Sequence, residues 1–215
     1  RDKLQLPVQM NRSSAIPEHL APQQGELIMF ENSALLERLS RMRYTTVLIV
    51  YLPVIALAVY LCLIRGTGIA ATAGLFLGGV VFWTFFEYFF HRFVFHFNAT
   101  TPFQHKILFT IHGVHHQYPN DKDRLVMPIT VSIPLAALFG LLFVSVMGDS
   151  GWGFFAGFGA GYVGYDMMHY AVHHVQNSKS ALFRKIRRHH MAHHFRDTRQ
   201  GFGVSSYFWD RVFKT

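Results

Sequence analysis

Fourteen histidines are present in the 215-residue chain, and twelve of them lie in three short segments. The segments are HRFVFH at 91–96, HGVHH at 112–116, and residues 169–194, which alone contain seven histidines. A neutral imidazole nitrogen is a common metal ligand in proteins and suits iron, copper and zinc. The clustering therefore predicts a polyhistidine metal site.

The spacing of these histidines fits helices, because residues three and four apart lie on one face of an α-helix. The pattern HxxHH occurs twice, at 112–116 and 190–194, and His169 and His173 are four apart. Each set is expected to converge on a point beside its own helix. His91 and His96 are five apart, about 140° around an ideal helix. That pair requires a bulge, a helix end or a separate ion for each member.

Two other interpretations of the histidines are less consistent with this pattern. Uncharged histidines packed in a core would leave many buried ring nitrogens in need of hydrogen-bond partners. A solvated, pH-sensing surface would need no repeated spacing. Outside the three segments, His19 is expected to be solvated and His105 to be structural.

The composition indicates one membrane domain, since hydrophobic residues make up 51% and charged residues only 15% of the chain, against roughly a quarter charged in soluble domains. The single cysteine, Cys62, excludes an intrachain disulfide and a cysteine-based zinc or iron–sulfur site. The formal charge is +8, but no nucleic-acid motif accompanies the basic residues. We therefore expect contact with anionic lipid headgroups and not with nucleic acid.

Four apolar stretches are each expected to cross a bilayer. Their approximate bounds are 45–64, 69–87, 126–147 and 152–168. The fourth is rich in glycine and alanine, which allows close helix packing. Residues 1–44 are predicted to form a polar arm with an interfacial helix from about 31 to 43, carrying Leu35, Leu36 and Leu39. The first apolar stretch begins too late for a cleavable signal peptide, and the missing initiator methionine indicates that an upstream segment has been removed.

The predicted fold is an all-α integral membrane protein, with four transmembrane helices and, on one side of the membrane, a helical cap that holds the polyhistidine site; the resemblance described below implies that the site is dinuclear. The cap comprises residues 88–125 and 169–215. This topology places 19 of the 20 Lys and Arg residues on the side that also carries the clustered histidines. Because positive residues mark the cytoplasmic face, the site is expected in the cytosol, at the endoplasmic reticulum membrane in a eukaryote or at the inner membrane in a bacterium.

The order of the motifs closely resembles the fatty acid hydroxylase superfamily. HRFVFH is followed by HGVHH with QYPNDKDRLVMP, then by YDMMHYAVHH, and finally by HHMAHHF with GFGVSSYFWDRVF. Within the superfamily the likeness is to fatty acid 2-hydroxylases that act on sphingolipid acyl chains, and it runs from about Trp83 to the C-terminus. It implies a membrane-embedded oxygenase with two metal ions, iron for activity and zinc possible in the purified protein. Sterol desaturases, sterol methyl oxidases and carotenoid hydroxylases have similar histidine motifs.

The resemblance implies ten histidine ligands, about five for each ion. They are His91, His96, His112, His115, His116, His169, His173, His190, His193 and His194. Two carboxylates are candidates for supporting them. Asp166 can accept a ring N–H from His169, three residues later, or pair with Arg187 or Arg188. Glu87, four residues before His91, could likewise support that histidine or form an ion pair. His174 and His189, on the wrong helical face for ligands, are expected to support them or to be solvated.

Eukaryotic members of the superfamily commonly carry a fused cytochrome b5-like haem domain, and residues 1–44 cannot hold one. The electrons are therefore expected from a separate donor, cytochrome b5-like or ferredoxin-like, with its reductase, unless such a domain was removed. Lys185, Arg187 and Arg188 could dock an acidic carrier, or they could contact lipid headgroups.

The expected reaction is hydroxylation at C2 of a long fatty acyl chain, free or in a ceramide or other sphingolipid, with dioxygen and two electrons. Breaking such a C–H bond requires a redox metal and not acid–base side chains alone. The acyl chain is expected in a groove between the fourth span and the cap, lined by Phe154, Phe158, Met167 and Met168. One alternative is a sterol- or carotenoid-type hydroxylase or desaturase. Another is a non-catalytic metal-binding or metal-transporting membrane protein, which would have ligands along a pore, whereas the middles of these spans contain no histidine.

Overall fold

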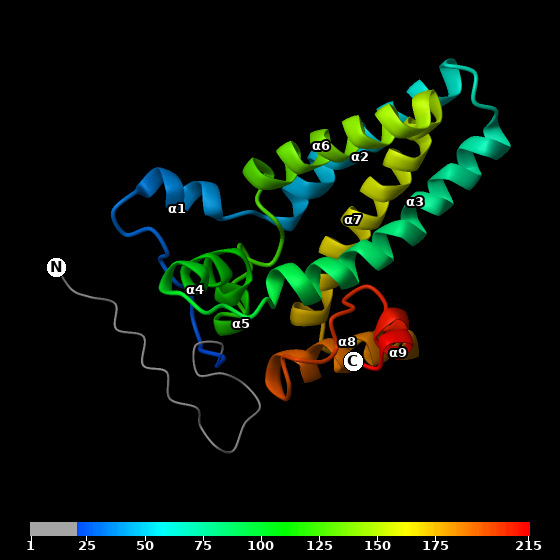
Figure 1. Cartoon of the computed structure of the whole chain (residues 1–215). Coiled ribbons are helices and arrows are strands. Elements are labelled where there is room, and N and C mark those ends of the chain that lie inside the picture. The colour runs from blue at the N-terminus through cyan, green and yellow to red at the C-terminus, as the bar shows by residue number, and fades with distance from the viewer. Residues whose placement is uncertain (1–20) are drawn as a thin grey trace.

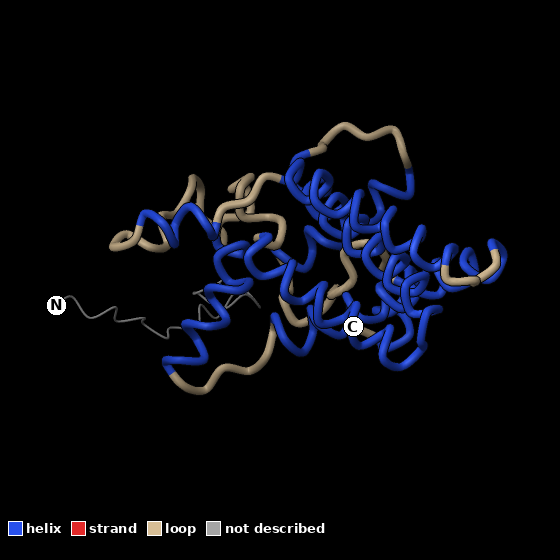
Figure 2. The backbone as a smooth tube through the Cα atoms, turned by 90° about the horizontal axis from the view of Figure 1, so that it is seen from above, coloured by secondary structure: helices blue, strands red, loops and turns tan. Residues whose placement is uncertain are grey.

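Residues 21–215 are described by the computed structural model, and every regular element in that range is a helix (Figures 1 and 2). Four long helices form a bundle: α2 (Tyr44–Ile64), α3 (Ile69–Phe90), α6 (Ile129–Met147) and α7 (Gly151–His174). The shorter elements gather at one end of it (Figure 1). They are α1 (Ala34–Ser40), η2 (His91–Phe95), α4 (Pro102–Leu108), η3 (Phe109–Gly113), α5 (Val114–Gln117), α8 (Ala181–Phe195) and α9 (Phe208–Phe213). The predicted all-α fold is confirmed for the described residues.

Three helical segments of the described chain are long and apolar enough to cross a membrane. They are Tyr44–Ile64, Ile69–Phe95 and Ile129–His174. The third contains both α6 and α7, joined by the short helix η4 (Gly148–Ser150), where Gly148 takes a φ of 61°. The chain reverses there, and α6 and α7 lie side by side (Figure 1). Four separate crossings therefore stay a prediction.

The helix ends differ from the predicted span boundaries. Pro128 adopts an extended ψ of 139°, so α6 begins at Ile129 and not at 126. At the other end of this pair, α7 continues beyond residue 168 to His174. One unbroken helix thus runs from the bundle into the cap and carries His169 and His173. The outer faces of the bundle are apolar, with Ile49, Leu141 and Val146 more than 70% exposed, as expected of helices in contact with lipid.

The centre of the bundle is α7, and its glycines let α3 approach closely. A Cβ atom on Gly157 would overlap the carbonyl oxygen of Phe76, and one on Gly79 of α3 would overlap the carbonyl oxygen of Phe154. A Cβ on Gly161 would overlap Trp83. The predicted role of the small residues in close packing is therefore confirmed at Gly157, where the backbone of α3 leaves no room for a side chain, and at Gly161, where the Trp83 side chain fills that space.

Gly157→Val is expected to destabilise the protein by about 3 kcal/mol or more, since the added side chain meets backbone atoms that cannot move aside. Gly164→Val in the same helix is the matched control, because a Cβ there would meet nothing within 4 Å. Equilibrium unfolding in mixed detergent micelles measures both. Equal stability of the two variants would contradict this account of the α3–α7 contact.

The arm before α2 is docked on the loop that follows α5. Ser33 caps α1 by accepting a hydrogen bond from the Leu36 N–H at 3.3 Å. Glu37 accepts hydrogen bonds from the backbone of Met29 and Phe30 and from Arg41. It also accepts one at 2.5 Å from Arg124, whose side chain is only 2% exposed. A helix occurs in the predicted stretch but is shorter, 34–40 instead of 31–43, and its place at a membrane interface stays a prediction. Residues 1–20, including His19, lie outside the described range.

This docking is expected to weaken in acid. Burial alone would raise the pKa of Glu37, but hydrogen bonds from Arg41, Phe30 and Arg124 outweigh it and lower the pKa from 4.5 to about 2. The stability that the charged Glu37 contributes is therefore present above about pH 4.5 and lost as the pH falls towards 2. Thermal melting should show Glu37→Gln less stable than wild type at pH 7, with a difference that shrinks by pH 2.5. Glu31→Gln, at an exposed position, is the control; an unchanged difference would refute this.

Candidate metal centre

The ten histidines that the sequence singled out as ligands lie together as two groups of five. The His116 group contains His91, His96, His112, His116 and His193; the His194 group contains His115, His169, His173, His190 and His194. Within each group, one ring nitrogen from every member lies within 4.8 Å of the others. All except His96 are buried. Metal binding itself stays a prediction, but the structure assembles the predicted residues.

A π-helical turn resolves the awkward spacing of His91 and His96. The helix α3 continues into η2, where hydrogen bonds span five residues and the turn is wider than in an α-helix. Residues five apart then lie on nearly the same face. His96 ends the turn with a φ of −119°, and its ring centroid is 5.0 Å from that of His91. Of the three possibilities open at the sequence level, the bulge and the helix end both occur, whereas separate ions do not fit, because His91 and His96 lie in one group.

Each HxxHH motif serves both groups, and the expectation that its three histidines converge on one point is wrong. His112 and His116 belong to one group and His115 to the other. The C-terminal motif divides in the same way: His190 and His194 belong to the His194 group and His193 belongs to the His116 group. The physical reason is that adjacent residues point about 100° apart on a helix. The second and third histidines of HxxHH therefore point to different groups, which brings the groups side by side.

The nitrogen spacing within the groups fits metal coordination. The Nε2 atoms of His112 and His116 are 3.0 Å apart, as are those of His173 and His190. With metal–nitrogen bonds of roughly 2.1 Å, two ligands at a right angle have nitrogens about 3.0 Å apart, and tetrahedral ligands about 3.4 Å. Neutral imidazoles whose lone pairs meet at one point repel unless a cation lies between them. Five such ligands per group suit an ion with more than four coordination positions.

Two of the rings are held by backbone carbonyl oxygens, each of which accepts a hydrogen bond from Nδ1, the ring nitrogen that does not face the group. His91 Nδ1 donates to the Phe202 carbonyl at 2.5 Å, and His193 Nδ1 donates to the Gln200 carbonyl at 2.7 Å. Because a carbonyl oxygen can only accept, each Nδ1 carries the proton and each Nε2 presents its lone pair to the group. This is the usual support for a metal-bound histidine.

The loop that supplies these carbonyls is held by two buried carboxylates. Glu87 accepts hydrogen bonds from the N–H groups of Val204 at 2.6 Å and Ser205 at 2.8 Å, and from the Ser205 hydroxyl. Asp210 accepts from the N–H groups of Phe202 and Gly203, both at 2.8 Å, and lies 3.0 Å from His189 Nε2. Glu87 was a candidate from its place before His91, although it acts on the loop and not on that ring. The sequence analysis missed Asp210, since no spacing connects it to a histidine.

Asp166 does not have the predicted contact. It is 1% exposed, but it forms no hydrogen bond with His169 and no ion pair with Arg187 or Arg188. Its carboxylate lies towards Tyr162, one turn earlier on α7, and towards the backbone of Met127. The Asp166 side chain thus points back towards Tyr162, four residues earlier, and not forward to His169, three residues later. The predicted support of His169 is not seen.

Burial favours the neutral form of several clustered histidines by lowering their pKa. Burial lowers the pKa of His112, His115 and His116 well below 6.5, and the positive charge that each neighbour would carry if protonated lowers it further. Burial also lowers the pKa of His193, to about 4, although the hydrogen bond to Gln200 acts in the opposite direction. Protons therefore compete weakly with a metal ion for these nitrogens.

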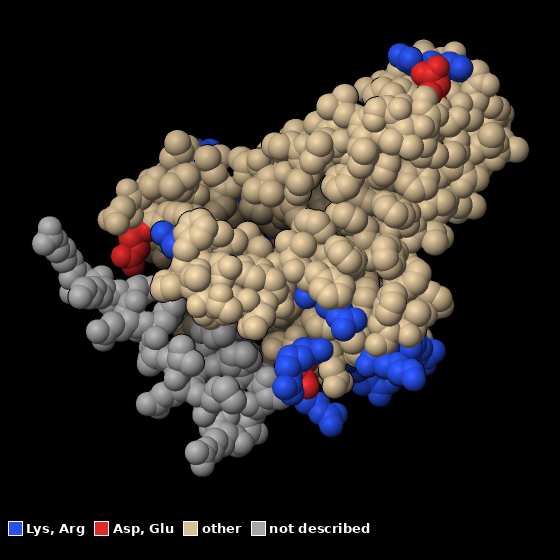
Figure 3. All heavy atoms as spheres, in the orientation of Figure 1, with Lys and Arg blue, Asp and Glu red and all other residues tan. Residues whose placement is uncertain are grey.

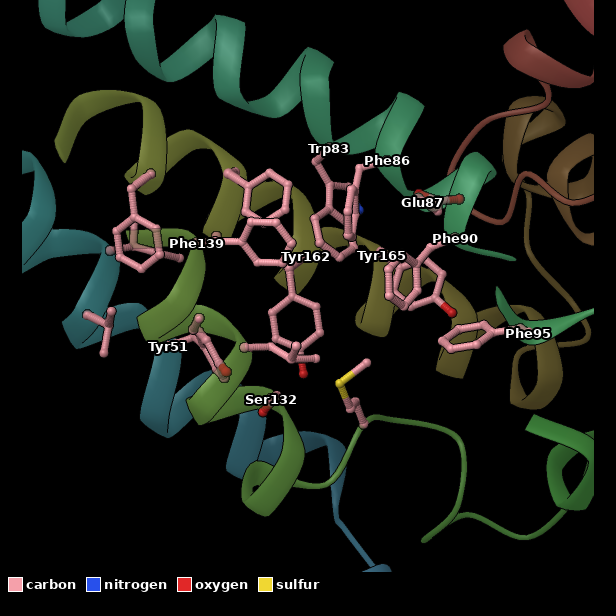
Figure 4. A pocket seen from close by; sticks show the side chains of 18 residues that line it. Tyr51, Trp83, Phe86, Glu87, Phe90, Phe95, Ser132, Phe139, Tyr162 and Tyr165 are labelled. Atoms are coloured by element: carbon pink, nitrogen blue, oxygen red, sulfur yellow. The ribbon is translucent and has the colours of Figure 1, made fainter. Parts of the chain in front are cut away.

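Two cavities with shared walls lie near the histidine groups, and the outer one reaches them. The inner cavity lies between α2, α3, α6 and α7 and is lined mainly by aromatic and aliphatic side chains (Figure 4). The outer cavity reaches from the α1 arm to His112, His115 and His169. Both share the walls Phe90, Phe95, Met127, Leu135 and Tyr165. Of the four residues predicted to line a groove, Phe158 lines the inner cavity, whereas Phe154, Met167 and Met168 line neither, because they face other helices or the surface of α7.

The part of the chain that carries these histidine motifs also matches known proteins. The sequence model of the family described as fatty acid hydroxylase matches residues 76–215. The chain belongs to the fatty acid hydroxylase family. The matched range includes all ten clustered histidines, both supporting carboxylates and the loop that they hold.

Three similar proteins illustrate the range of this fatty acid hydroxylase family. The ceramide very long chain fatty acid hydroxylase SCS7 of Saccharomyces cerevisiae is 37% identical over 93% of this chain and 51% of its own length. The dihydroceramide fatty acyl 2-hydroxylase FAH1 of Arabidopsis thaliana is 34% identical over 78% of this chain and 70% of its own. The mouse fatty acid 2-hydroxylase is 39% identical over 66% and 39%. The chain thus spans about half the length of the yeast relative.

A solved structure gives the same picture of the fold. Full-length Scs7p, of which only the hydroxylase domain is visible, superimposes with a TM-score of 0.79 and 36% sequence identity. The alignment covers 84% of this chain and 69% of that one. The histidine-bearing helical domain of this chain therefore has the same fold as the hydroxylase domain of Scs7p.

Proposed function

We propose that this fatty acid hydroxylase inserts a hydroxyl group at C2 of a long acyl chain carried by a ceramide-type lipid, with dioxygen and two electrons. The observation that carries the proposal is the pair of five-histidine groups, members of which line the outer cavity, together with the apolar inner cavity that shares its walls. The inner cavity contains about 780 Å³ of atom-free space, including the part open to the outside, and no Lys or Arg lines it. Relatives at 33–39% identity are named as ceramide or fatty acyl hydroxylases.

The site residues have separable tasks in this proposal. The ten imidazoles hold the ions, and the carbonyls of Phe202 and Gln200 keep His91 and His193 in the tautomer that binds them. A bound pair of redox-active ions supplies the oxygen chemistry that side chains lack. The aromatic walls of the inner cavity bind the acyl chain, exclude water and restrict which carbon reaches the histidine groups.

Two iron ions are the proposed native cofactor, and zinc is expected to compete for the same imidazoles during purification. Five neutral nitrogen ligands per group leave a metal ion its full positive charge and leave coordination positions for other molecules. A protein loaded with zinc is therefore expected to be folded and inactive.

The proposed topology has four crossings, with the histidine groups on the cytosolic side. Lys and Arg are visible at the end of the molecule that carries α8 and α9 (Figure 3). The opposite tip has Arg65, paired with Asp149 at 2.8 Å. This asymmetry supports a cytosolic cap, at the endoplasmic reticulum membrane in a eukaryote or the inner membrane in a bacterium. The basic residues of α8, including Lys185, Arg187 and Arg188, are the proposed contact for an acidic cytochrome b5-like or ferredoxin-like electron donor.

Lipid profiling in cells tests the activity. Expression in cells that lack an acyl 2-hydroxylase is expected to produce 2-hydroxy acyl chains with wild type and none above background with His193→Ala. His105→Ala is a matched control, because His105 belongs to neither histidine group. If wild type and His193→Ala gave the same lipids, the proposed activity would be wrong; a new hydroxyl on a sterol or carotenoid would point to the alternative lipid classes.

A further inference from the structure

The loop between α5 and α6 lies beside the His194 group. We call its residues 121–127 the Arg124 loop. Arg124 and Leu125 line the outer cavity, and so do His115 and His169 of the His194 group. Leu125 is only 4% exposed. The backbone of this loop is therefore buried against the cavity wall that carries the histidines.

His169 has one ring nitrogen that faces away from its group. Its Nε2 lies 2.8 Å from the Nε2 of His115, inside the group, so Nδ1 points outwards. The backbone of Leu125 approaches the His169 ring, although Nδ1 forms no hydrogen bond of normal geometry. A carbonyl oxygen is a usual partner for the outer nitrogen of a metal-bound histidine. The Leu125 carbonyl is therefore placed for the task that the Phe202 carbonyl performs for His91.

Arg124 fastens one side of the loop to the arm before α2. Its side chain is only 2% exposed. The guanidinium donates hydrogen bonds to the Leu27 carbonyl at 3.1 Å, the Ser40 hydroxyl at 2.9 Å and the Glu37 carboxylate at 2.5 Å. It also lies 3.3 Å from the carboxylate of Asp121, in the loop itself. A buried guanidinium with this many partners is fixed in place, and the backbone of the next residue is fixed with it.

Asp166 fastens the other side of the loop to α7. Its buried carboxylate lies towards the backbone of Met127, two residues after Leu125. The loop at 200–205 is held in a similar way, because Glu87 accepts from an N–H group two residues after the carbonyl that accepts from His91. In both cases the carboxylate precedes a clustered histidine by about one helical turn. The carboxylate acts on the loop and not on the ring.

We propose that Arg124 is a positioning residue of the metal centre, which holds the Leu125 carbonyl where His169 Nδ1 can donate to it. The His169 Nε2 then presents its lone pair to the ion of the His194 group. This rests on the metal binding that is part of the proposed function. Each group of five histidines has its own supporting loop, and the arm before α2 belongs to the support of the His194 group, since Glu37 binds Arg124.

Chelator titration of the zinc-loaded full-length chain in detergent micelles tests this without turnover. Arg124→Met keeps much of the side-chain volume but removes every donor. It should release one ion at a chelator concentration about tenfold lower than wild type and the other ion as wild type does. Combining Arg124→Met with Glu87→Gln decides which ion is affected. The combination should release both ions early, because Glu87 supports the His116 group and Arg124 the His194 group.

A milder variant and a matched control complete the test. Glu37→Gln removes the charge of one partner of the guanidinium and should shift the same ion as Arg124→Met by a smaller factor. Arg38→Met, on the exposed side of α1, should release both ions as wild type does.

Three results would overturn the role of Arg124. These are release of both ions as in wild type from Arg124→Met and Glu37→Gln, equal weakening of both ions, and a combined variant that still holds one ion as wild type does. If the selective release follows Arg124 but cells form no 2-hydroxy acyl chains, the proposed function fails and the positioning role stands.

Discussion

His116→Ala is expected to lower the metal content from two ions per chain to one, and His116→Ala combined with His194→Ala to remove both. The physical reason is that the ten imidazoles form two separate sets of five, so one substitution affects one ion. Loss of an outer hydrogen-bond partner of a ligand already costs about 10- to 100-fold in metal affinity, and loss of a ligand should cost at least as much. Elemental analysis after dialysis against a chelator measures the ratio of metal to protein.

The same measurement needs a control for general disturbance. The rings of His116 and His194 are stacked with centroids 4.1 Å apart, so a cavity at one also touches the other. His116→Asn keeps more of the packing than alanine and should lose the same single ion. His105→Ala should keep both ions. Loss of both ions in every single variant would show that the two groups are one cooperative site, and loss of none would remove the basis for metal binding.

Glu87→Gln is expected to weaken metal binding by the His116 group by about 10- to 100-fold and to lower any activity that depends on it. The carboxylate holds Val204 and Ser205, and two residues earlier Phe202 accepts the hydrogen bond of His91. Val204 N–H and Ser205 N–H both donate to Oε1 and the Ser205 hydroxyl donates to Oε2, so a glutamine, with one acceptor oxygen, cannot accept from both sets of donors. The loop can then shift the carbonyl that orients His91.

Selectivity between the groups distinguishes this positioning role from a general loss of stability. His193 and His91 depend on the loop through Gln200 and Phe202, whereas no hydrogen bond joins the loop to the rings of the His194 group. Chelator titration should therefore release one ion from Glu87→Gln at lower chelator concentration and the other as in wild type. Glu31→Gln is the exposed control. Equal weakening of both ions would contradict the role assigned to Glu87.

The histidine set could be predicted from the sequence because metal ligands recur at helical spacing. Which histidine joins which group could not, because that depends on where α8 lies relative to α5. The π-helical turn at His91–Phe95 was only one of three ways to satisfy a spacing of five. Helix extents also depend on tertiary contacts: α7 passes its apolar stretch and remains helical to His174 because its last turns are buried in the cap.

The supporting groups were the least predictable part of the site. Two of them are backbone carbonyls, at Gln200 and Phe202. Every residue has a backbone carbonyl, so the residue type does not indicate which carbonyl is used. Asp210 is distant in sequence from every ligand that it stabilises. Asp166 had suitable spacing but turned towards Tyr162, because the choice between two neighbouring turns depends on what surrounds the helix.

The division of α8 between the two groups determines when the centre can form during biosynthesis. His193 belongs to one group, and His190 and His194 belong to the other, so both draw on the last quarter of the polypeptide. All the apolar helices leave the ribosome before these residues do. When the apolar helices have been synthesised, seven of the ten clustered imidazoles are present and neither set is complete. If the two sets bind metal as predicted, metallation is a late maturation step, and termination before residue 190 would leave neither set able to form.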